Sequence, residues 1–412
     1  MQVVIQADRL FDGTGAEPIE QAAVVIGEGR IRAVGRRDDL VAPDGEAQRV
    51  EYAGCTILPG LIDCHVHLVF SAGPRPLDDL LADDDHALLL RAVHNAQTAL
   101  RAGITTVKDL GGRGAVTLAL RDAVGRGLLP GPRILAAGPP ITTTGGHCNW
   151  LGGEADTADE LRKKVRQLVK QGVDLLKVMS SGGRMTPGSN VCAAQFTVEQ
   201  LRALVEDAHR LGKPVAAHGH GVAGIRNAVA AGVDVVEHCS WVSTRAGNRV
   251  EYDEAVAERM ARQGTFVDPT LSPAMARRDA DPSTLTPGQL ESREIRPHVH
   301  AAHRRSIELG VEVAAGTDAG VASTPFNSLP SELRLLNELL GLSPARALRA
   351  ATYNAARSAA VDGDIGSIQP GRRADLLIVP GNPLEDLRAL DNVRAVYKDG
   401  LPEVERGRLL RS

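Results

Sequence analysis

Aromatic side chains are scarce in this chain, and neither sign of charge dominates it. Phe, Trp and Tyr together make up 3% of the 412 residues, so few rings are available to stack on unpaired bases. The formal net charge of -4 provides no basic stripe for a phosphate backbone. We therefore expect no nucleic-acid partner. The hydrophobic fraction of 43% and the charged fraction of 24% are those of an ordinary soluble globular protein.

Long apolar runs and paired cysteines are also missing. No uninterrupted apolar stretch approaches the roughly 20 residues that a membrane-spanning helix needs. The first residues lack the charged start and the apolar core of a signal peptide. The cysteines are odd in number and form no C-x-x-C pair, which predicts reduced thiols at Cys55, Cys64, Cys148, Cys192 and Cys239. These absences favour a cytoplasmic protein with no membrane partner.

Both ends of the chain are rich in predicted strands. Near the N-terminus, short strands are expected over residues 2–7, 22–26, 30–34 and 49–52, with a hairpin turn at Glu28-Gly29. Near the C-terminus, strand-like segments at 374–379 and 393–397 are followed by a turn at Asp399-Gly400. Two strand-rich ends around a different middle predict one small β-sandwich domain, assembled from residues 1–56 and 361–412.

The middle of the chain, residues 57–360, alternates buried strands with amphipathic helices. Eight such strands predict an α/β fold, a (β/α)8 TIM barrel. A doubly wound open sheet is the alternative, but no Gly-x-Gly-x-x-Gly motif follows the first strand. The clearest helices are 86–101, 158–171, 198–211 and 332–340, the third with a capping box between Thr197 and Gln200. The expected strands are 56–62, 105–109, 133–137, 175–178, 214–217, 233–237, 265–268 and 311–315.

Potential metal ligands stand where several of these strands end. His65 and His67 follow the first strand, and residues i and i+2 of an extended chain point to the same face. Imidazole is the commonest metal ligand in proteins, and active residues of a barrel sit at the C-terminal ends of its strands. A single histidine at a strand end is more often structural. The whole set predicts a metal site, because other strand ends carry Asp109, His218, His220, His238 and Asp318.

Lys177 lies inside the predicted fourth strand among apolar neighbours, where an unpaired ammonium is costly. One interpretation is a lysine that snorkels to the surface or pairs with a carboxylate. The other is a lysine whose pKa is lowered by burial, so that the neutral amine reacts with carbon dioxide. The resulting carbamate anion could bridge two metal ions.

Two loop residues are candidate substrate contacts. His147 follows two glycines in the loop after the third strand, where the backbone can approach a substrate closely. Arg184 follows Lys177 and could bind an anionic substrate group, although a solvated loop arginine explains it equally well. His298 and His300 repeat the H-x-H spacing in a charged helical region, so both are expected at the surface. We also expect no ligand role for the helical His86, His94 and His209.

Taken together, these motifs resemble the amidohydrolase superfamily of metal-dependent hydrolases. The resemblance covers PGLIDCHVH at residues 59–67, Lys177, VAAHGH at 215–220, Glu237-His238 and GTD at 316–318. It continues through residues 343–356 and 366–376, which are similar to the closing helices and to the return into the small β-domain. Within the superfamily, the chain is most similar to Xaa-Pro dipeptidases, imidazolonepropionase-like proteins and ochratoxin-type carboxypeptidases that cleave N-acyl amino acids.

The resemblance implies a binuclear site that usually holds zinc. His65, His67 and Asp318 would hold one ion, and His218 and His238 the other. Lys177, as N6-carboxylysine, would bridge the two ions, and His220 would face the substrate. Spacing alone does not distinguish His218 from His220 as the ligand, because both point the same way.

The activity implied is cleavage of the amide or peptide bond of a dipeptide or an N-acyl amino acid by water that the metal ions activate. Asp318 would act as general base and then as general acid. His220, with His147, would donate hydrogen bonds to the developing oxyanion or to a substrate carboxylate. By analogy with the superfamily, we expect a homo-oligomer.

Two alternatives remain open. The first is an enzyme that opens a cyclic amide or a deaminase, which in this superfamily typically uses one metal ion and no carboxylated lysine. The second is a non-catalytic homologue, although every expected ligand position is filled here.

Overall fold

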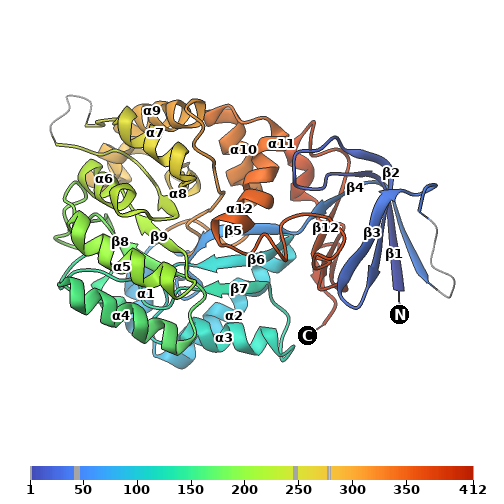
Figure 1. Cartoon of the computed structure of the whole chain (residues 1–412), viewed down its shortest axis with the longest axis horizontal. Coiled ribbons are helices and arrows are strands. Elements are labelled where there is room, and N and C mark those ends of the chain that lie inside the picture. Colours follow the sequence, from blue (N-terminus) through green and yellow to red (C-terminus); the bar gives the residue numbers. More distant parts are fainter. Residues whose placement is uncertain (1, 41–46, 245–248, 276–277, 279, 412) are drawn as a thin grey trace.

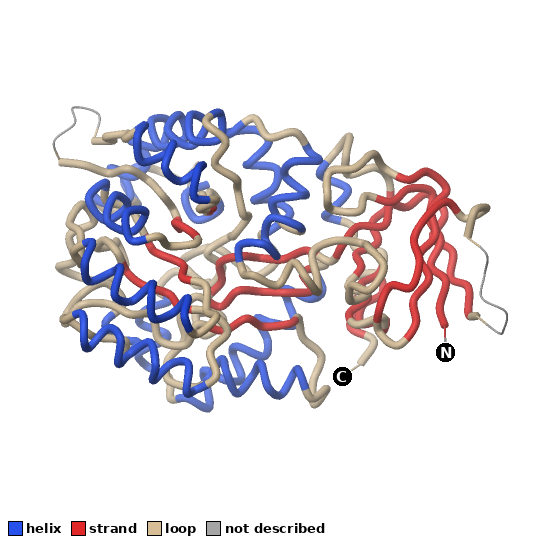
Figure 2. Tube along the Cα trace, viewed as in Figure 1, coloured by secondary structure: helices blue, strands red, loops and turns tan. Residues whose placement is uncertain are grey.

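The chain folds into a mixed α/β structure, seen in a computed structural model that describes residues 2–40, 47–244, 249–275, 278 and 280–411. One end consists of parallel strands surrounded by helices, and the other consists mainly of a larger sheet (Figures 1 and 2). Within the described residues, none of the helices combines the length and the apolar composition needed to cross a bilayer.

Strands from both ends of the chain form one eight-stranded sheet in the order β15-β14-β13-β12-β4-β1-β2-β3. The halves join where β4 pairs in parallel with β1 and antiparallel with β12. The predicted turns at Glu28-Gly29 and Asp399-Gly400 are confirmed by positive φ angles of 55° and 75°, and of 50° and 74°. The β-sandwich and its domain boundaries stay predictions. The strands are β1 (Gln2–Leu10), β2 (Ile19–Gly27), β3 (Arg30–Arg36), β4 (Gln48–Pro59), β12 (Leu376–Pro380), β13 (Ala395–Lys398), β14 (Leu401–Glu405) and β15 (Arg408–Leu409).

Seven strands from the middle of the chain form two parallel sheets. One has the order β5-β6-β7 and the other β11-β10-β9-β8. Parallel bridges extend from them, between Ile141 and Val178 and between Val267 and Val313. The strands are β5 (Leu61–Val66), β6 (Ile104–Asp109), β7 (Arg133–Ala136), β8 (Leu176–Met179), β9 (Val215–His218), β10 (Val235–Glu237) and β11 (Phe266–Asp268).

Helices alternate with these strands along the chain. Thr197 and Gln200 form the predicted capping box at the start of α5, which confirms that start signal. The helices are α1 (Pro76–Ala82), α2 (Asp85–Arg101), α3 (Val116–Gly125), α4 (Ala158–Gln171), α5 (Val198–Arg210), α6 (Val222–Ala231), α7 (Glu254–Gln263), α8 (Ser272–Met275), α9 (Pro287–Glu308), α10 (Leu329–Leu340), α11 (Pro344–Ala350) and α12 (Tyr353–Ser358), with short 3-10 turns at Asn149–Leu151, Pro282–Thr284 and Leu387–Asp391.

Alternate residues of the parallel strands belong to different apolar clusters. In β9, Val215 and Ala217 pack in the cluster that includes the helices, whereas Ala216 packs in a smaller cluster with residues of neighbouring strands. In β8, Leu176 and Val178 belong to the helix-packed cluster, so Lys177 between them points to the opposite side. This alternation carries polar side chains into the interior between the strands.

Two predicted strands differ from the structure. The first, over residues 56–62, is divided at Gly60: β4 ends at Pro59 and β5 begins at Leu61, so His65 lies within its strand rather than after it. A side chain at Gly60 would overlap with Thr105, which explains the glycine at this junction. The eighth, over 311–315, makes one parallel bridge in the described chain, between Val313 and Val267, in which the amide of Ala314 bonds Val267; the amide of Ala315 bonds Ala350 of α11 instead.

Candidate active site

The sequence-predicted histidines and Asp318 meet at the ends of β5, β9 and β10. His65 lies near the end of β5 and His67 directly after it. The Oδ1 atom of Asp318 lies 3.5 Å from Nε2 of His65 and 3.2 Å from Nε2 of His67. Potential ligand atoms of His65, His238 and Asp318 all lie within 4.8 Å of one another. These three residues could therefore hold one cation.

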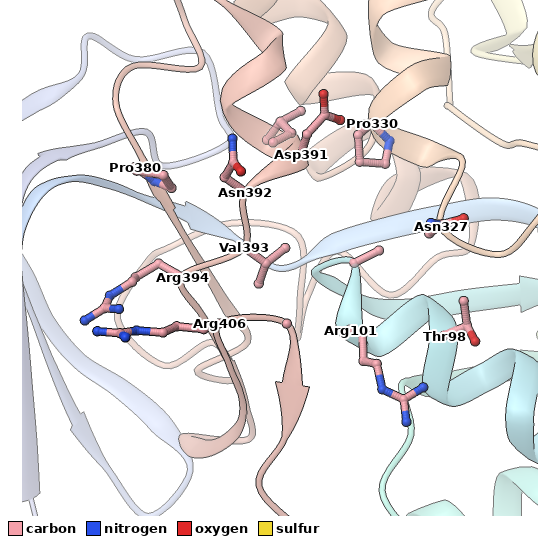
Figure 3. A pocket seen from close by; sticks show the side chains of 13 residues that line it. Thr98, Arg101, Asn327, Pro330, Pro380, Asp391, Asn392, Val393, Arg394 and Arg406 are labelled. Carbon is pink, nitrogen blue, oxygen red and sulfur yellow. The ribbon is translucent and has the colours of Figure 1, made fainter.

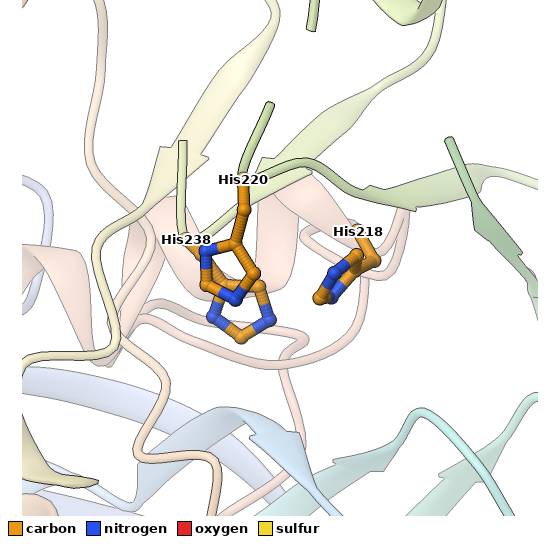
Figure 4. Close-up of side chains that lie close together, drawn as sticks. All are labelled: His218, His220 and His238. Carbon is orange, nitrogen blue, oxygen red and sulfur yellow. The ribbon is translucent and has the colours of Figure 1, made fainter. Parts of the chain in front are cut away.

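His218, His220 and His238 form an adjoining group whose ligand atoms also lie within 4.8 Å of one another. The rings of His220 and His238 are stacked with centroids 4.5 Å apart, and His218 lies 4.7 Å from each of them (Figure 4). His238 belongs to both groups, so the two candidate cation positions adjoin. The geometry keeps both His218 and His220 as candidate ligands.

Several of these histidines have one ring nitrogen bound by an outer partner. His67 donates from Nδ1 to the carbonyl of Gly111 at 3.3 Å, which leaves Nε2 free to face Asp318. The Nδ1 atom of His238 lies 2.7 Å from the hydroxyl of Thr270. Partners of this kind fix the ring orientation and the tautomer of metal-binding histidines.

Burial favours the neutral form of five of these imidazoles, which is the form that binds metal. It lowers the pKa of His65 to about 4, that of His147 to about 4 and that of His220 to about 3. Burial and neighbouring histidines also lower the pKa of His218 and His238. Burial tends to raise the pKa of Asp318, but the nearby His65 and His67 outweigh it and bring that pKa below its usual value.

Lys177 projects from β8 into this group and is 1% exposed. Its Nζ atom has no hydrogen-bond partner in the described part of the chain. Burial lowers the pKa of the Lys177 ammonium, although the carboxylates of Glu237, Asp318 and Asp268 act in the opposite direction. Burying an amine without a hydrogen-bond partner costs free energy of folding, unless the amine is covalently modified or binds a ligand.

Sequence reasoning missed two carboxylates beside His65. Glu237 Oε2 lies 3.1 Å from Nδ1 of His65, and Asp268 Oδ2 lies 3.7 Å from the same atom. Burial would raise the pKa of Glu237, but Lys177 and His65 lower it below the usual range. Burial and the adjacent Glu237 raise the pKa of Asp268 well above its usual value. Both residues end strands, β10 and β11, a position that makes them candidates but does not reveal their contact with His65.

A third missed carboxylate, Asp63, links His65 to the loop that carries Asp318. Asp63 in β5 accepts hydrogen bonds from the amide of Thr317 at 3.0 Å, from its hydroxyl at 2.7 Å and from the amide of His65 at 3.2 Å. Burial raises the pKa of Asp63 to about 7. Asp109, which we noted at a strand end, accepts from the amide of Leu68 at 2.8 Å and so holds the turn after His67.

A cavity of about 550 Å³ opens over the histidines, and both predicted substrate contacts line it. The ring of His147 lies 4.7 Å from that of His218, and its Nδ1 lies 3.2 Å from the hydroxyl of Thr186. Arg184 lines the same cavity, where it bonds the carbonyl of Gly288 at 3.1 Å and pairs with Glu291 at 3.4 Å. The structure thus brings both residues to the cavity with the predicted ligands.

One prediction about the remaining histidines is wrong. His298 is exposed as expected, but His300 is 8% exposed and lines the cavity. The two residues lie on different faces of α9, so one points to solvent and the other to the cavity wall. Exposure of His86, His94 and His209 is consistent with their exclusion as ligands.

A second cavity, of about 730 Å³, lies between α2, α10 and the eight-stranded sheet (Figure 3). Arg101, Arg394 and Arg406 line it, and no histidine does. Its one acidic residue, Asp391, is paired with Arg334 at 2.7 Å. This cavity contains none of the potential metal ligands, so the chemistry belongs to the first one.

The donor set of the first cavity suits divalent metal ions. Imidazole nitrogens and carboxylate oxygens are the usual ligands of zinc, and catalytic zinc sites leave a position open to water or substrate. The orphaned amine of Lys177 among these ligands is also accounted for if it becomes a carboxylate group.

Comparisons with known proteins agree with this chemistry. Ochratoxinase from Aspergillus niger is 30% identical over 423 aligned positions, covering 95% of this chain and 84% of that protein. An imidazolonepropionase from Paracoccus denitrificans is 27% identical, covering 87% of this chain and 88% of that protein. The crystal structure of a Xaa-Pro dipeptidase with bound methionine in the active site matches with a TM-score of 0.86 and 31% identity, covering 98% of this chain and 99% of that one.

The amidohydrolase family matches residues 56–401, which include every candidate ligand. The predicted membership is confirmed. The chain belongs to the amidohydrolase family, whose general chemistry is the metal-dependent hydrolysis of amide bonds.

Proposed function

We propose that this protein is a binuclear hydrolase that cleaves the amide bond of a dipeptide or an N-acyl amino acid. The parallel strands would close into a (β/α)8 barrel (residues 57–360), and the two ends of the chain would form the smaller β domain. Support comes from the parallel bridges that extend the two sheets and from the names of the similar proteins, ochratoxinase and Xaa-Pro dipeptidase. We also propose that the protein is located in the cytoplasm and forms a homo-oligomer.

Two zinc ions fit the donor set best. His65, His67 and Asp318 would hold one ion, and His218 with His238 the other. Lys177 would be N6-carboxylysine and bridge them. His220, whose Nδ1 lies 2.9 Å from the hydroxyl of Ser240, would turn Nε2 toward the substrate.

Lys177 is the observation that carries this proposal. A buried amine without a hydrogen-bond partner, next to three carboxylates and a group of neutral histidines, has no structural role that a shorter apolar residue could not fill. As a neutral amine it can add to carbon dioxide, because burial lowers its pKa. The carbamate formed would be an oxygen ligand for both cation positions.

The mechanism follows from where the chain's own groups lie. When bound, the ions would lower the pKa of a shared water and polarise the scissile carbonyl. Asp318 would take the proton of the attacking water and pass it to the leaving nitrogen, a role supported by its position beside His65 and His67 at the cavity. His220 and His147 would donate hydrogen bonds to the carbonyl oxygen as negative charge develops on it. Arg184 would contact the outer part of the substrate.

Opening of a cyclic amide is the second candidate, because the chain is also similar to an imidazolonepropionase. The metal count discriminates between the two functions. Two ions per chain would support the binuclear hydrolase of dipeptides or N-acyl amino acids, and one ion would support the opening of a cyclic amide.

The decisive experiment combines metal analysis with a hydrolysis screen. Zinc-reconstituted protein should hold two ions per chain and hydrolyse members of a panel of dipeptides and N-acyl amino acids. Lys177→Ala should lose metal and activity, and added short carboxylates should restore part of both. Lys163→Ala, on the exposed side of α4, is the matched control and should change neither.

A second variant tests the proton transfer. Asp318→Asn should reduce turnover by several orders of magnitude while the metal content falls much less. Full activity in Lys177→Ala without added carboxylate, or undiminished turnover in Asp318→Asn, would refute the proposal.

A further inference from the structure

One face of α9 forms a wall of the active-site cavity. Gln289, Arg293, Arg296 and His300 all line the cavity and recur every three or four residues, so they form one stripe along the helix. The inner end of this stripe is the buried His300. Seven residues earlier, and therefore about 10 Å along the helix axis, Arg293 stands toward the outer part of the cavity.

Several arginines line the outer part of the cavity, and some of them are paired with a carboxylate whereas Arg293, among the described residues, is not. Arg75 pairs with Asp78 at 3.6 Å, and Arg184 pairs with Glu291 at 3.4 Å. Arg293 instead bonds only the carbonyl of Ala280, at 3.0 Å from Nη1, and no carboxylate of the described residues pairs with it. A guanidinium has five N–H donors, so most of those on Arg293 remain available to a ligand.

A half-buried guanidinium facing a ligand cavity is suited to a carboxylate. Its planar donors match the two oxygens of a carboxylate group, and such paired hydrogen bonds are stronger than neutral ones. Cleavage of a dipeptide or an N-acyl amino acid leaves a free amino acid, whose carboxylate lies on the leaving-group side of the scissile bond.

We propose that Arg293 binds this carboxylate and thereby selects substrates with a free C-terminal acid. The assignment rests on the proposed function. It differs from the sequence-based expectation, in which Arg184 binds the anionic group. Arg184 already contacts Glu291 at 3.4 Å and the carbonyl of Gly288 at 3.1 Å, so it attaches the start of α9 to the neighbouring loop and keeps fewer donors for a ligand than Arg293 does.

The test compares an acid with its carboxamide. Zinc-reconstituted wild type is assayed on an N-acyl-phenylalanine and on its amide, and calorimetry measures binding of N-acetyl-phenylalanine and N-acetyl-phenylalaninamide. Arg293→Gln should raise KM for the acid by about 10- to 100-fold, because one charge-assisted contact is lost. The KM for the C-terminal carboxamide should be unchanged. Arg304→Gln is the matched control: it lies on the same helix, bonds one backbone carbonyl, that of Leu339, and does not line the cavity.

The outcomes separate this inference from the proposed function. Loss of the preference for the acid in Arg293→Gln but not in Arg304→Gln supports the inference. An unchanged preference in Arg293→Gln, or its loss in Arg184→Gln instead, overturns it. If the wild type hydrolyses neither compound, the proposed function fails. Acid-selective binding that depends on Arg293 would still support the carboxylate site, and equal binding of acid and amide would overturn it.

Discussion

Replacing Glu237 by glutamine tests whether the carboxylates beneath His65 serve the metal site. The substitution keeps the shape of the side chain and removes its charge. Glu237 and Asp268 both approach Nδ1 of His65, at 3.1 and 3.7 Å, and all three side chains are buried. Neither oxygen of Glu237 has another hydrogen-bond partner in the described residues, so its interaction with this imidazole and with Lys177 dominates its environment.

The distances set the size of the effect. His65 is neutral, so each contact joins its ring to a carboxylate and contributes about 1.5–3 kcal/mol, and the two distances to Nδ1, 3.1 Å from Glu237 and 3.7 Å from Asp268, are similar. Asp268 can therefore replace most of what Glu237 supplies. We expect Glu237→Gln alone to weaken metal affinity about fivefold and Asp268→Asn still less. Together they should weaken it about 100-fold, the upper range for loss of an outer partner of a metal-binding histidine.

Competition with a chromophoric chelator measures this affinity directly. Glu403→Gln, a buried glutamate of the eight-stranded sheet, is the control for replacing an interior carboxylate. The double variant should lose more affinity than the two single variants combined, because each carboxylate substitutes for the other. A double variant that binds zinc within twofold of the wild type would refute this role.

Three further predictions follow from single contacts. A methyl group at Gly183 would overlap with the ring of His147, so Gly183→Ala should reduce turnover, as His147→Ala should. Gly125→Ala is the control and should not change turnover, because a Cβ atom there would meet no atom within 4 Å. Equal turnover of all three variants and the wild type would contradict this prediction. Burial raises the pKa of Glu332 to about 7, so its neutral form is favoured in the folded state, and stability should fall from about pH 4.5 to pH 7 by about 3 kcal/mol. Because Asp63, whose pKa is also raised to about 7, adds a slope of the same sign, Glu332→Gln should reduce rather than abolish the pH dependence of urea unfolding of the metal-free protein; the same slope in both would refute the assignment. Addition of carbon dioxide to the neutral amine of Lys177 forms the carbamate and releases one proton, so zinc uptake with dissolved carbon dioxide should release more protons per bound zinc in the wild type than in Lys177→Ala, as an indicator dye would report; equal release would contradict carbamate formation.

The candidate ligands could be predicted from the sequence because strand ends carry the site in this architecture. His65, His67, His218 and His238 follow or end short apolar runs, and parallel strands bring such ends together. The position of Lys177 was predictable for a similar reason, since period-two alternation turns one residue of a buried strand to the other side. Strand boundaries were less certain, as the break at Gly60 shows.

Other parts of the site could not be found from local patterns. His300 belongs to a helix whose charged sequence indicates a solvated element, and only tertiary packing turns one of its faces to the cavity. Glu237 and Asp268 are strand ends too, but their function depends on a distance to His65 that no spacing along the chain encodes. For the same reason, Asp63 could not be recognised as the residue that ties His65 to the loop carrying Asp318.

The interior near His65 is better explained by binding than by stability. Glu237, Asp268, Lys177 and Lys108 are all buried, and among the residues that the structure describes Lys108 bonds only the hydroxyl of Ser358, at 3.5 Å. Burying a charge without full hydrogen bonding costs several kcal/mol, and apolar side chains of similar volume often stabilise a core more. Burial and repulsion from Glu237 raise the pKa of Asp268 well above its usual value. A chain selected for a stable fold alone would fill this space with leucine or valine, so the charged groups imply that cations complete the site.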